Sequence, residues 1–234
     1  MSNYYCFSDK KIIFANEEPN VMDYDILKSV SQGGDGAQDA ENNRIEAIAD
    51  ELCRRCELYE AQLGDSQSNV SPFEMEQRAA ESFAKEFDLW LPMEKVFDLG
   101  TPGPCGNEND TYVSNDIIYK VNNLLNTGCI LGLLDKVRMH NEIFPETFYQ
   151  FFAFTGFDGR TIMPILRQDL VKYAKPATQI MIDTYMAALG FEKITNEGRF
   201  TNGHYEVWDV VPRNALVDVE GDIFVVDAEI KLIK

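Results

Sequence analysis

The chain contains no hydrophobic run of about 20 residues, the length that a transmembrane helix requires. It also lacks a basic N-terminal stretch followed by an apolar one, so neither a membrane span nor a secretory signal is predicted. Basic residues are few: the chain has 21 Lys and Arg but 39 Asp and Glu, which gives a net charge of −18. A surface that follows phosphates needs a basic excess, so this balance argues against direct binding of duplex nucleic acid or of an anionic membrane.

Cysteine and histidine are also scarce, with five and two residues. The cysteines are odd in number and scattered, which predicts free thiols in a reducing compartment and hence a cytoplasmic protein. Cys53 and Cys56 have CxxC spacing, but they lie in a helical pattern without a second pair, which favours buried thiols over a zinc or redox site. We expect His140 to be structural and His204 to be exposed. No Ser–His–acid pattern supports a hydrolase triad.

The chain has enough apolar residues to form a core, because 45% of its 234 residues are hydrophobic and 12% are aromatic. Apolar residues recur every three or four positions over 40–64, which predicts an amphipathic helix whose charged residues, including Glu41, Arg44 and Glu51, face solvent. A second helix begins after Ser71, which forms a capping box with Glu74, and Pro72 suits the first helical position. Its apolar stripe continues to Phe87, and Pro92 ends the pattern.

The remaining chain alternates short strands with two further helices. This order, with helices set apart and strands joined by hairpins, predicts an α+β fold rather than a doubly wound sheet. The expected elements are a strand at 96–101, strands at 110–113 and 117–121 around a turn at 114–116, a helix carrying Ile130 to Val137 and capped by Asn126 or Thr127, a hairpin of 148–157 and 161–166 with Asp158 and Gly159 at its turn, a helix opened by Pro176 and closed by Gly190, and short strands over 191–234.

The most informative pair of residues is Asp209 and Asn214, which are five positions apart. This is the spacing of a kinase catalytic loop, where the aspartate accepts the proton of the substrate hydroxyl and the asparagine holds a metal ion. An Asp and an Asn five residues apart also occur by chance, so the neighbouring residues must show whether this pair indicates a kinase site.

A predicted hairpin follows this pair. The runs at 215–218 and 223–226 resemble strands, and symmetric pairing around 219–222 places Asn214 opposite Asp227. An amide oxygen and a carboxylate would then meet at the open end of the hairpin, and oxygen ligands suit Mg²⁺. An ordinary hairpin with a hydrogen-bonded turn at its mouth would give the same residue pattern.

A loop with several glycines and a lysine on a strand lie upstream. Gly103 and Gly106 belong to a loop whose backbone N–H groups could hold phosphates, and Lys120 on the following strand could supply positive charge to them. The glycines or the lysine alone would be unremarkable in a strand-to-strand connection. Because they come before Asp209, Asn214 and Asp227, as in a kinase, the whole set indicates a kinase-like site more specifically than any one residue does.

These segments resemble a known family. The stretches 106–113, 118–123, 140–147 and 168–171, together with Trp208-Asp209, Asn214 and Asp227, look like the serine/threonine/tyrosine kinase-like domain of bacterial polyvalent proteins, which are large proteins of phages and conjugative elements. The resemblance covers roughly 95–234. It implies a protein-kinase-like fold, ATP and Mg²⁺.

The resemblance also implies roles for individual residues. Lys120 would contact the α- and β-phosphates, Asp209 would be the catalytic base, and Asn214 and Asp227 would hold the metal. The adenine-binding hinge would fall at Gln168 to Leu170. The acid that pairs with Lys120 is Glu142 or Asp135, and we favour Glu142.

The sequence departs from the family pattern at three points. Gly103 and Gly106 do not form a complete GxGxxG motif, Trp208 stands where a kinase has arginine, and Asp227 is followed by Ala-Glu instead of Phe-Gly. Only seven residues follow Asp227. We therefore expect a minimal kinase-like fold with an antiparallel N-terminal lobe over about 95–167, a reduced C-terminal lobe over about 168–234, and residues 1–94 as a helical extension packed on this core.

The predicted function is an ATP- and Mg²⁺-dependent phosphotransferase whose partners are the nucleotide and an unidentified hydroxyl acceptor, either a protein or a small molecule. One alternative is a kinase-like module that binds nucleotide without turnover. Another is an acidic interaction protein of a mobile element, suggested by the net charge of −18.

Overall fold

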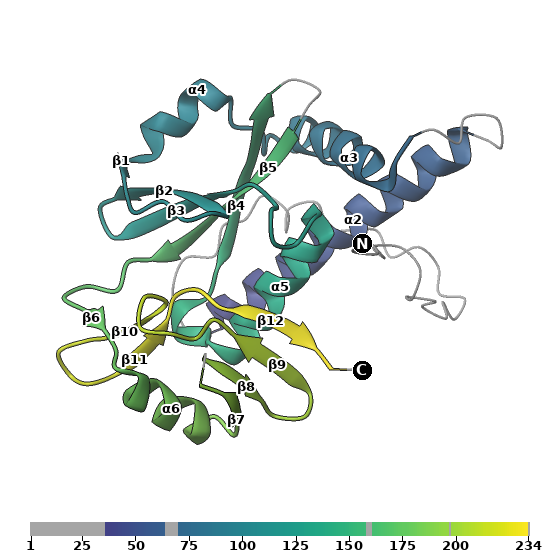
Figure 1. The fold of residues 1–234 in the computed structure, drawn as a ribbon. Helices are drawn as coiled ribbons and strands as arrows, with labels where there is room; N and C mark the ends of the chain where they lie inside the picture. The colour runs from purple at the N-terminus through teal and green to yellow at the C-terminus, as the bar shows by residue number, and fades with distance from the viewer. Residues whose placement is uncertain (1–35, 64–69, 158–160, 197, 234) are drawn as a thin grey trace. The chain divides into compact units, whose positions relative to one another are not determined.

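The computed structural model describes residues 36–63, 70–157, 161–196 and 198–233, and it divides into two compact units (Figure 1). The N-terminal unit comprises the described residues up to Ser114, together with Tyr119–Asp135 and Gln150–Arg167. The C-terminal unit comprises Asn115–Ile118, Lys136–Tyr149 and the described residues from Gln168 onward. The turn expected at Asp158 and Gly159 lies outside the described residues.

Helices and antiparallel sheets are mixed along the chain, as predicted for an α+β fold. None of the helices in the described part is long and apolar enough to cross a membrane. The elements are α2 (Ala37–Leu63), α3 (Pro72–Glu86), α4 (Met93–Val96), η1 (Phe97–Leu99), β1 (Thr101–Pro102), β2 (Asn109–Ser114), β3 (Ile117–Asn122), α5 (Ile130–Ile143), η2 (Pro145–Thr147), β4 (Gln150–Phe157), β5 (Thr161–Asp169), β6 (Lys175–Pro176), α6 (Gln179–Ala188), β7 (Glu192–Thr195), β8 (Arg199–Thr201), β9 (Tyr205–Trp208), β10 (Ala215–Val217), β11 (Ile223–Val225) and β12 (Glu229–Leu232).

A five-stranded sheet, in the order β1-β2-β3-β5-β4, forms the framework of the N-terminal unit. Helices α2 and α3 contact each other and strand β4. Their apolar stripes are fully buried at Ile45, Ile48 and Leu52 of α2 and at Phe83 of α3. The capping box at the start of α3 is present as predicted, since the Ser71 side chain accepts from the Glu74 backbone and the Glu74 side chain accepts from the Ser71 backbone.

The charged face expected on α2 is not wholly solvent-exposed. Glu41, Arg44 and Glu51 are each at most 1% exposed. Glu41 Oε1 accepts the backbone N–H of Phe151 at 2.9 Å, and Arg44 donates to the Phe151 carbonyl at 2.6 Å. These two side chains satisfy the backbone of Phe151, beside the β-bulge at which β4 leaves its regular register with β5. The prediction was wrong because charge alone does not report what a helix face contacts.

The start of α5 also differs from its prediction. The helix begins at Ile130, so the residue before it is Cys129 and not the predicted Asn126 or Thr127. Instead, the Glu76 carboxylate of α3 accepts the backbone N–H groups of Ile130 at 2.8 Å and of Leu131 at 2.9 Å. A cap supplied by a distant helix cannot be recognised from residues adjacent to the helix start.

The strand expected at 96–101 is mostly helical. Residues Met93–Val96 form α4 and Phe97–Leu99 a 3₁₀ turn, so only Thr101 and Pro102 pair as a strand. Val96 and Leu99 pack in the same apolar cluster. Their spacing of three residues is helical, whereas a strand would alternate its buried residues.

The C-terminal unit contains a three-stranded sheet, β11-β10-β6, and a four-stranded sheet, β12-β9-β8-β7. Its core includes Ile182 and Met186 of α6, both fully buried. The helix expected to open at Pro176 begins at Gln179, because Pro176 pairs with Leu216 in β10 and Thr178 caps the helix.

Candidate functional site

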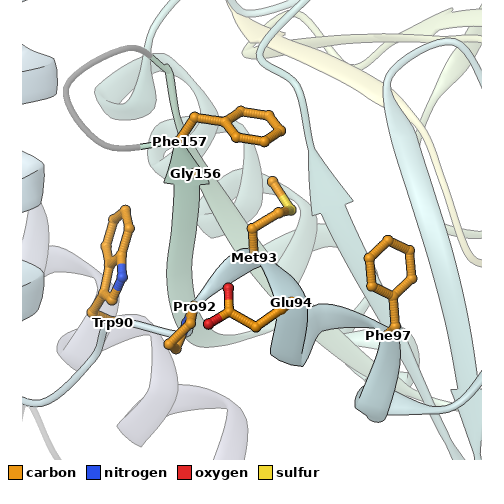
Figure 2. Close-up of a pocket in the computed structure, with 7 residues that line it drawn as sticks. All are labelled: Trp90, Pro92, Met93, Glu94, Phe97, Gly156 and Phe157. Carbon is orange, nitrogen blue, oxygen red and sulfur yellow. The ribbon is translucent and has the colours of Figure 1, made fainter.

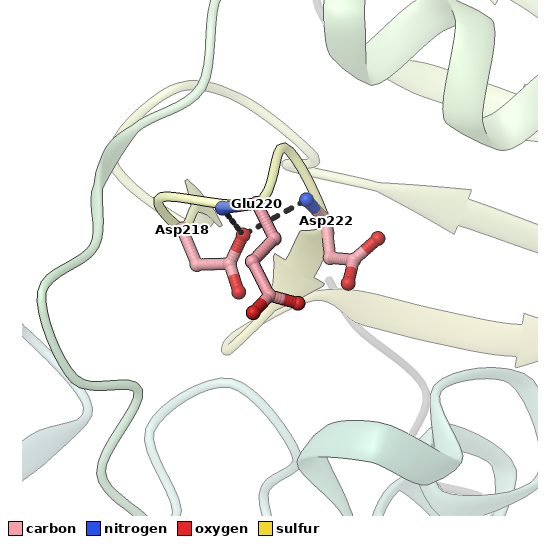
Figure 3. A group of neighbouring side chains, drawn as sticks. All are labelled: Asp218, Glu220 and Asp222. Atoms are coloured by element: carbon pink, nitrogen blue, oxygen red, sulfur yellow. Dashed lines mark hydrogen bonds between the residues drawn. The ribbon is translucent and has the colours of Figure 1, made fainter.

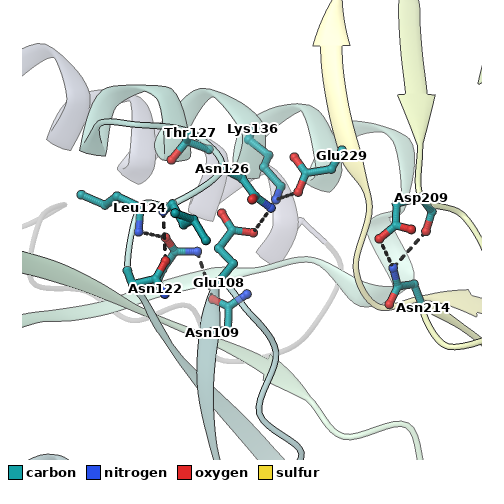
Figure 4. Close-up of polar contacts among 12 residues, drawn as sticks. Glu108, Asn109, Asn122, Leu124, Asn126, Thr127, Lys136, Asp209, Asn214 and Glu229 are labelled. Atoms are coloured by element: carbon teal, nitrogen blue, oxygen red, sulfur yellow. Dashed lines mark hydrogen bonds and ion pairs between the residues drawn. The ribbon is translucent and has the colours of Figure 1, made fainter. Parts of the chain in front are cut away.

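Asp209 and Asn214 come together at the end of strand β9 in the C-terminal unit. The Asn214 side-chain amide donates to Asp209 Oδ2 at 2.8 Å and to the Asp209 backbone carbonyl at 2.9 Å (Figure 4). Asp209 has φ of 62°, an uncommon conformation for a residue other than glycine, which surrounding bonds must hold. The spacing of five residues therefore corresponds to direct contact between the two side chains.

Arg213 occupies the other oxygen of this carboxylate. Its guanidinium donates to Asp209 Oδ1, and the Arg213 side chain is 70% exposed. An exposed ion pair contributes roughly 0–1 kcal/mol to stability, so Arg213 can leave this position at little cost. Both oxygens of Asp209 have a protein partner in this arrangement.

The β9–β12 strand pair, and not the predicted β10–β11 hairpin, places the backbone of Asp227 near that of Asp209. Strands β9 and β12 are antiparallel, with Trp208 opposite Glu229. Asp209 follows Trp208 directly and Asp227 precedes Glu229 by two residues, so both leave the same end of this ladder. Asp227 is half-buried.

The predicted pairing of Asn214 with Asp227 across the β10–β11 hairpin is wrong by one residue. Ala215 pairs with Val225, and the Val226 N–H donates to the Asn214 carbonyl at 2.9 Å. Asn214 therefore lies opposite Val226. A slip of one residue moves a side chain to the other face of a hairpin.

The turn of this hairpin explains the register. Asp218 Oδ1 accepts the backbone N–H groups of Glu220 and Asp222, each at 2.9 Å (Figure 3). It also accepts the N–H of Gly221 at 2.9 Å. The Asp218 N–H donates to the Asp222 carbonyl at 3.1 Å, so the loop between these two residues contains 219–221, with Gly221 at φ of 96°. The symmetric pairing assumed a loop of four residues, 219–222. The Asp218, Glu220 and Asp222 carboxylates lie within 4.8 Å of one another as a result of this tight turn.

Lys120 and the glycine loop belong to the N-terminal unit. Lys120 lies in β3 and is 6% exposed. The N–H of Gly103 donates to the Thr111 carbonyl at 2.9 Å, and that of Gly106 to the Asn109 carbonyl at 3.0 Å. Both N–H groups thus belong to the bonding between the loop and β2, and they are not the free phosphate donors that the sequence suggested.

A polar network fixes this glycine loop to the segment after β3. Asn126 donates to the Glu108 carboxylate at 3.1 Å, and Asn122 donates to the Asn109 side chain at 3.0 Å (Figure 4). Asn123 donates to the Asn107 carbonyl at 2.7 Å. Glu108 and Asn122 are buried, so the loop has a defined shape without help from a ligand.

A comparison with known families matches residues 74–234 to a family described as a serine/threonine/tyrosine kinase found in polyvalent proteins. The matched region is more than half of the chain. The chain belongs to this family. The resemblance inferred from the sequence is thereby confirmed, while no curated protein and no solved structure matches the chain.

The residues predicted as the hinge and as the helix acid have partners within the protein. Gln168 donates its side-chain amide to the Thr147 carbonyl at 2.5 Å, and the Leu170 N–H donates to the Asp116 carbonyl at 2.8 Å. Glu142 accepts from the Tyr205 hydroxyl at 2.8 Å. Burial, with this hydrogen bond to Glu142, raises the pKa of Tyr205 to about 12. A role for Glu142 with Lys120, and a hinge at 168–170, remain predictions.

A separate cavity of about 510 Å³ opens on the N-terminal unit (Figure 2). None of the site residues predicted from the sequence lines it. Its walls are Trp90, Pro92, Met93, Glu94, Phe97, Gly156 and Phe157.

The sequence did not predict the ion pair between Lys136 and Glu229, in which Lys136 Nζ lies 2.9 Å from Glu229 Oε1 (Figure 4). Glu229 comes two residues after Asp227, at the position where the sequence departs from the Asp-Phe-Gly pattern. The burial of the acids Glu41 and Glu76 was not predicted either. A usable signal existed, because Glu41 continues the helical spacing of Ile45 and Ile48, and Glu76 that of Ala80 and Phe83.

Proposed function

We propose that this kinase-family chain is a phosphotransferase that uses ATP and Mg²⁺ to phosphorylate a hydroxyl acceptor. The observation that carries the proposal is the contact between Asp209 and Asn214, two residues at kinase catalytic spacing joined by two hydrogen bonds. Phosphoryl transfer requires mainly positioning and charge stabilisation, so a small, well-ordered polar site suffices.

Two oxygen donors of the C-terminal unit support the magnesium part of this proposal. Asn214 uses its amide nitrogen on Asp209, which leaves its amide oxygen without a partner among the described residues. The Asp227 carboxylate likewise has no hydrogen-bond partner in the described part of the chain. Asn214 and Asp227 would hold Mg²⁺ through these oxygens. Because Val226 and not Asp227 lies opposite Asn214, the two ligands would approach the ion from different positions of the hairpin and not as a facing pair. When bound, Mg²⁺ neutralises charge on the phosphate oxygens.

Two further residues would act on the reactants. Asp209 would accept the proton of the acceptor hydroxyl, for which one of its oxygens must exchange the Arg213 guanidinium for the acceptor. The low cost of releasing an exposed arginine permits this exchange. Lys120 would place its positive charge against the α- and β-phosphates.

A second candidate function is nucleotide binding without turnover. The observation that favours it is the double occupation of the Asp209 carboxylate by Arg213 and Asn214. If Arg213 does not leave, Asp209 has no free oxygen for an acceptor. The involvement of the Gly103 and Gly106 N–H groups in the loop also fits a modified phosphate site.

Asp209→Asn separates the two functions. The new amide oxygen can still accept from Asn214, but the side chain cannot take up a proton. For an active enzyme we expect phosphoryl transfer to fall by about 10²- to 10⁴-fold, with ATP binding nearly unchanged. The measurements are release of ADP with an acceptor panel, autophosphorylation, and calorimetric binding of ATP with Mg²⁺. Asp222→Asn, in the nearby hairpin turn, is the matched control.

Lys120→Met tests the phosphate contact in the same assays. Loss of a charge-assisted bond worth roughly 1.5–3 kcal/mol should weaken ATP binding by about 10- to 100-fold. Wild-type protein that binds ATP with Mg²⁺ but transfers no phosphoryl group would favour the binding module. Wild-type protein that binds neither would refute both functions.

A further inference from the structure

The chain on both sides of Asp227 is held by one segment of the C-terminal unit, Lys136–Tyr149, which we call the supporting segment. Before Asp227, the Tyr149 hydroxyl donates to the Val226 carbonyl at 3.0 Å, and the Thr147 hydroxyl donates to the Val225 carbonyl at 2.5 Å. After Asp227, Lys136 pairs with the Glu229 carboxylate at 2.9 Å. Asp227 therefore lies between two points of attachment to the same segment.

The attachments are well shielded from water. The Lys136 and Glu229 side chains are 9% and 19% exposed, whereas both side chains of the Lys193–Asp183 pair and of the Arg213–Asp209 pair are at least 30% exposed. Tyr149 is 5% exposed. A pair that is mostly out of water is screened less by salt and holds its geometry more firmly than a surface pair.

The supporting segment is itself rigid. Asn141 donates to the Tyr149 carbonyl at 2.9 Å and accepts the Tyr149 N–H at 2.6 Å. The buried His140 ring contacts the Thr147 carbonyl at 3.1 Å. These bonds fix the positions of the Thr147 and Tyr149 hydroxyls relative to helix α5.

The supporting segment is also connected, through Val226, to the other candidate magnesium ligand, Asn214. Val226, whose carbonyl accepts from Tyr149, donates its N–H to the Asn214 carbonyl at 2.9 Å. Glu229 is opposite Trp208, the residue before Asp209. A displacement of the supporting segment would therefore move the chain that carries all three candidate site residues.

From this geometry we infer that Lys136 and Tyr149 are positioning residues that set the geometry of the magnesium ligands Asp227 and Asn214. This inference rests on the proposed function only in assigning Mg²⁺ to those ligands. Neither residue touches the metal in this assignment. Residues that orient metal ligands typically change metal affinity by about 10- to 100-fold when replaced.

The test measures Mg²⁺ affinity rather than activity. Wild-type chain saturated with a non-hydrolysable ATP analogue is titrated with Mg²⁺ by calorimetry, in parallel with Lys136→Met and Tyr149→Phe. We expect the Mg²⁺ dissociation constant of Lys136→Met to rise at least tenfold, and that of Tyr149→Phe to rise by a smaller factor. Lys136→Arg keeps the charge and should restore affinity to near the wild-type value.

Matched controls separate positioning from general loss of stability. Lys193→Met removes another lysine that is ion-paired in this unit, to Asp183, and Tyr185→Phe removes the hydroxyl of a tyrosine that is half-buried instead of buried. Thermal melting of every variant identifies any that unfolds, and Tyr149→Phe, which removes a single oxygen, keeps the test open if Lys136→Met fails to fold.

The outcomes are distinct. Mg²⁺ dissociation constants within twofold of wild type in both Lys136→Met and Tyr149→Phe would overturn the inference, as would equal losses in the two controls. Wild-type chain that binds Mg²⁺ and nucleotide but transfers no phosphoryl group would refute the phosphotransferase alone. Wild-type chain that binds no Mg²⁺ would refute both.

Discussion

At the scale of single residues, the conformation of Asp209 depends on Asn214. A non-glycine residue at positive φ has an unfavourable backbone, which the two hydrogen bonds from the Asn214 amide offset. Asn214 thus has a structural role in addition to its proposed metal ligation. Because the role is local, its loss should lower stability without changing how the rest of the chain unfolds.

We predict that Asn214→Ala lowers the free energy of unfolding by about 1–3 kcal/mol, since each lost hydrogen bond contributes roughly 0.5–1.5 kcal/mol. Urea denaturation measures this change, and the dependence on urea concentration should stay as in wild type. Gln179→Ala, which removes one side-chain bond to Asp183, is the comparison. A change below about 0.5 kcal/mol for Asn214→Ala would show that Asp209 holds its conformation unaided.

Reactivity should differ sharply between two cysteines. Burial raises the pKa of Cys56 to about 12, whereas Cys105 is exposed in the glycine loop. A thiol with a pKa of about 12 has only about 10⁻⁵ of its population as thiolate at pH 7, and the thiolate is the reactive form. We predict that iodoacetamide labels Cys105 in the folded protein and Cys56 only after unfolding, as peptide mass spectrometry would show. Labelling of Cys56 at the rate of Cys105 would contradict its burial.

At the scale of elements, the contact between α3 and the start of α5 depends on one buried acid. Glu76 is 1% exposed, and its carboxylate accepts two N–H groups of α5. Burial raises the pKa of Glu76 above 4.5, although these two hydrogen bonds oppose the rise. The charged form is thus less favourable in the folded protein than in the unfolded chain.

The sign of the pH dependence follows. Between 4.5 and its raised pKa, Glu76 binds a proton more readily in the folded state, so its contribution to stability is greatest below 4.5 and declines as pH rises through the folded pKa. Glu76→Gln cannot titrate. We therefore predict that the stability of Glu76→Gln relative to wild type increases as pH is raised from 4.5 to about 7.5, as urea denaturation would measure. A relative stability independent of pH would mean that Glu76 has an ordinary pKa.

Local patterns predicted the elements better than their connections. The capping box at Ser71, the β2–β3 hairpin and α5 follow from spacing and turn residues close in sequence. The contact of Asp209 with Asn214 was also local. The β10–β11 register failed because it depends on how many residues the loop contains, which a single interaction of Asp218 with three backbone N–H groups decides.

Interactions between distant residues could not be predicted in the same way. The acids Glu41 and Glu76 bind backbone groups more than 50 residues away in the sequence, and Lys136 and Glu229 are 93 residues apart. An acid on an apolar helical stripe indicates that a buried partner exists, but it does not identify that partner. The candidate site residues could thus be predicted from the sequence, whereas the distant residues that hold them in place could not.

At the scale of the whole molecule, the region matched to the kinase family begins at residue 74, whereas α2 lies before it. Helix α2 nevertheless contacts α3 and β4, and it buries Ile45, Ile48 and Leu52 completely. Burying such side chains is worth roughly 1.5–3 kcal/mol each. A typical domain has a total stability of only about 5–15 kcal/mol. We therefore propose that α2 is required for folding of the N-terminal unit.

Truncation tests this proposal. A chain beginning at residue 70 keeps the Ser71 cap of α3 but loses α2, which uncovers apolar surface and removes the Glu41 and Arg44 bonds to Phe151. We predict aggregation, or binding of a hydrophobic dye with no cooperative thermal transition. A chain beginning at Gly36 keeps every described element and serves as the control for the loss of α2. If the chain beginning at residue 70 stays monomeric, melts cooperatively and binds ATP with normal affinity, α2 is a separate addition, and the sheet has enough packing of its own without it.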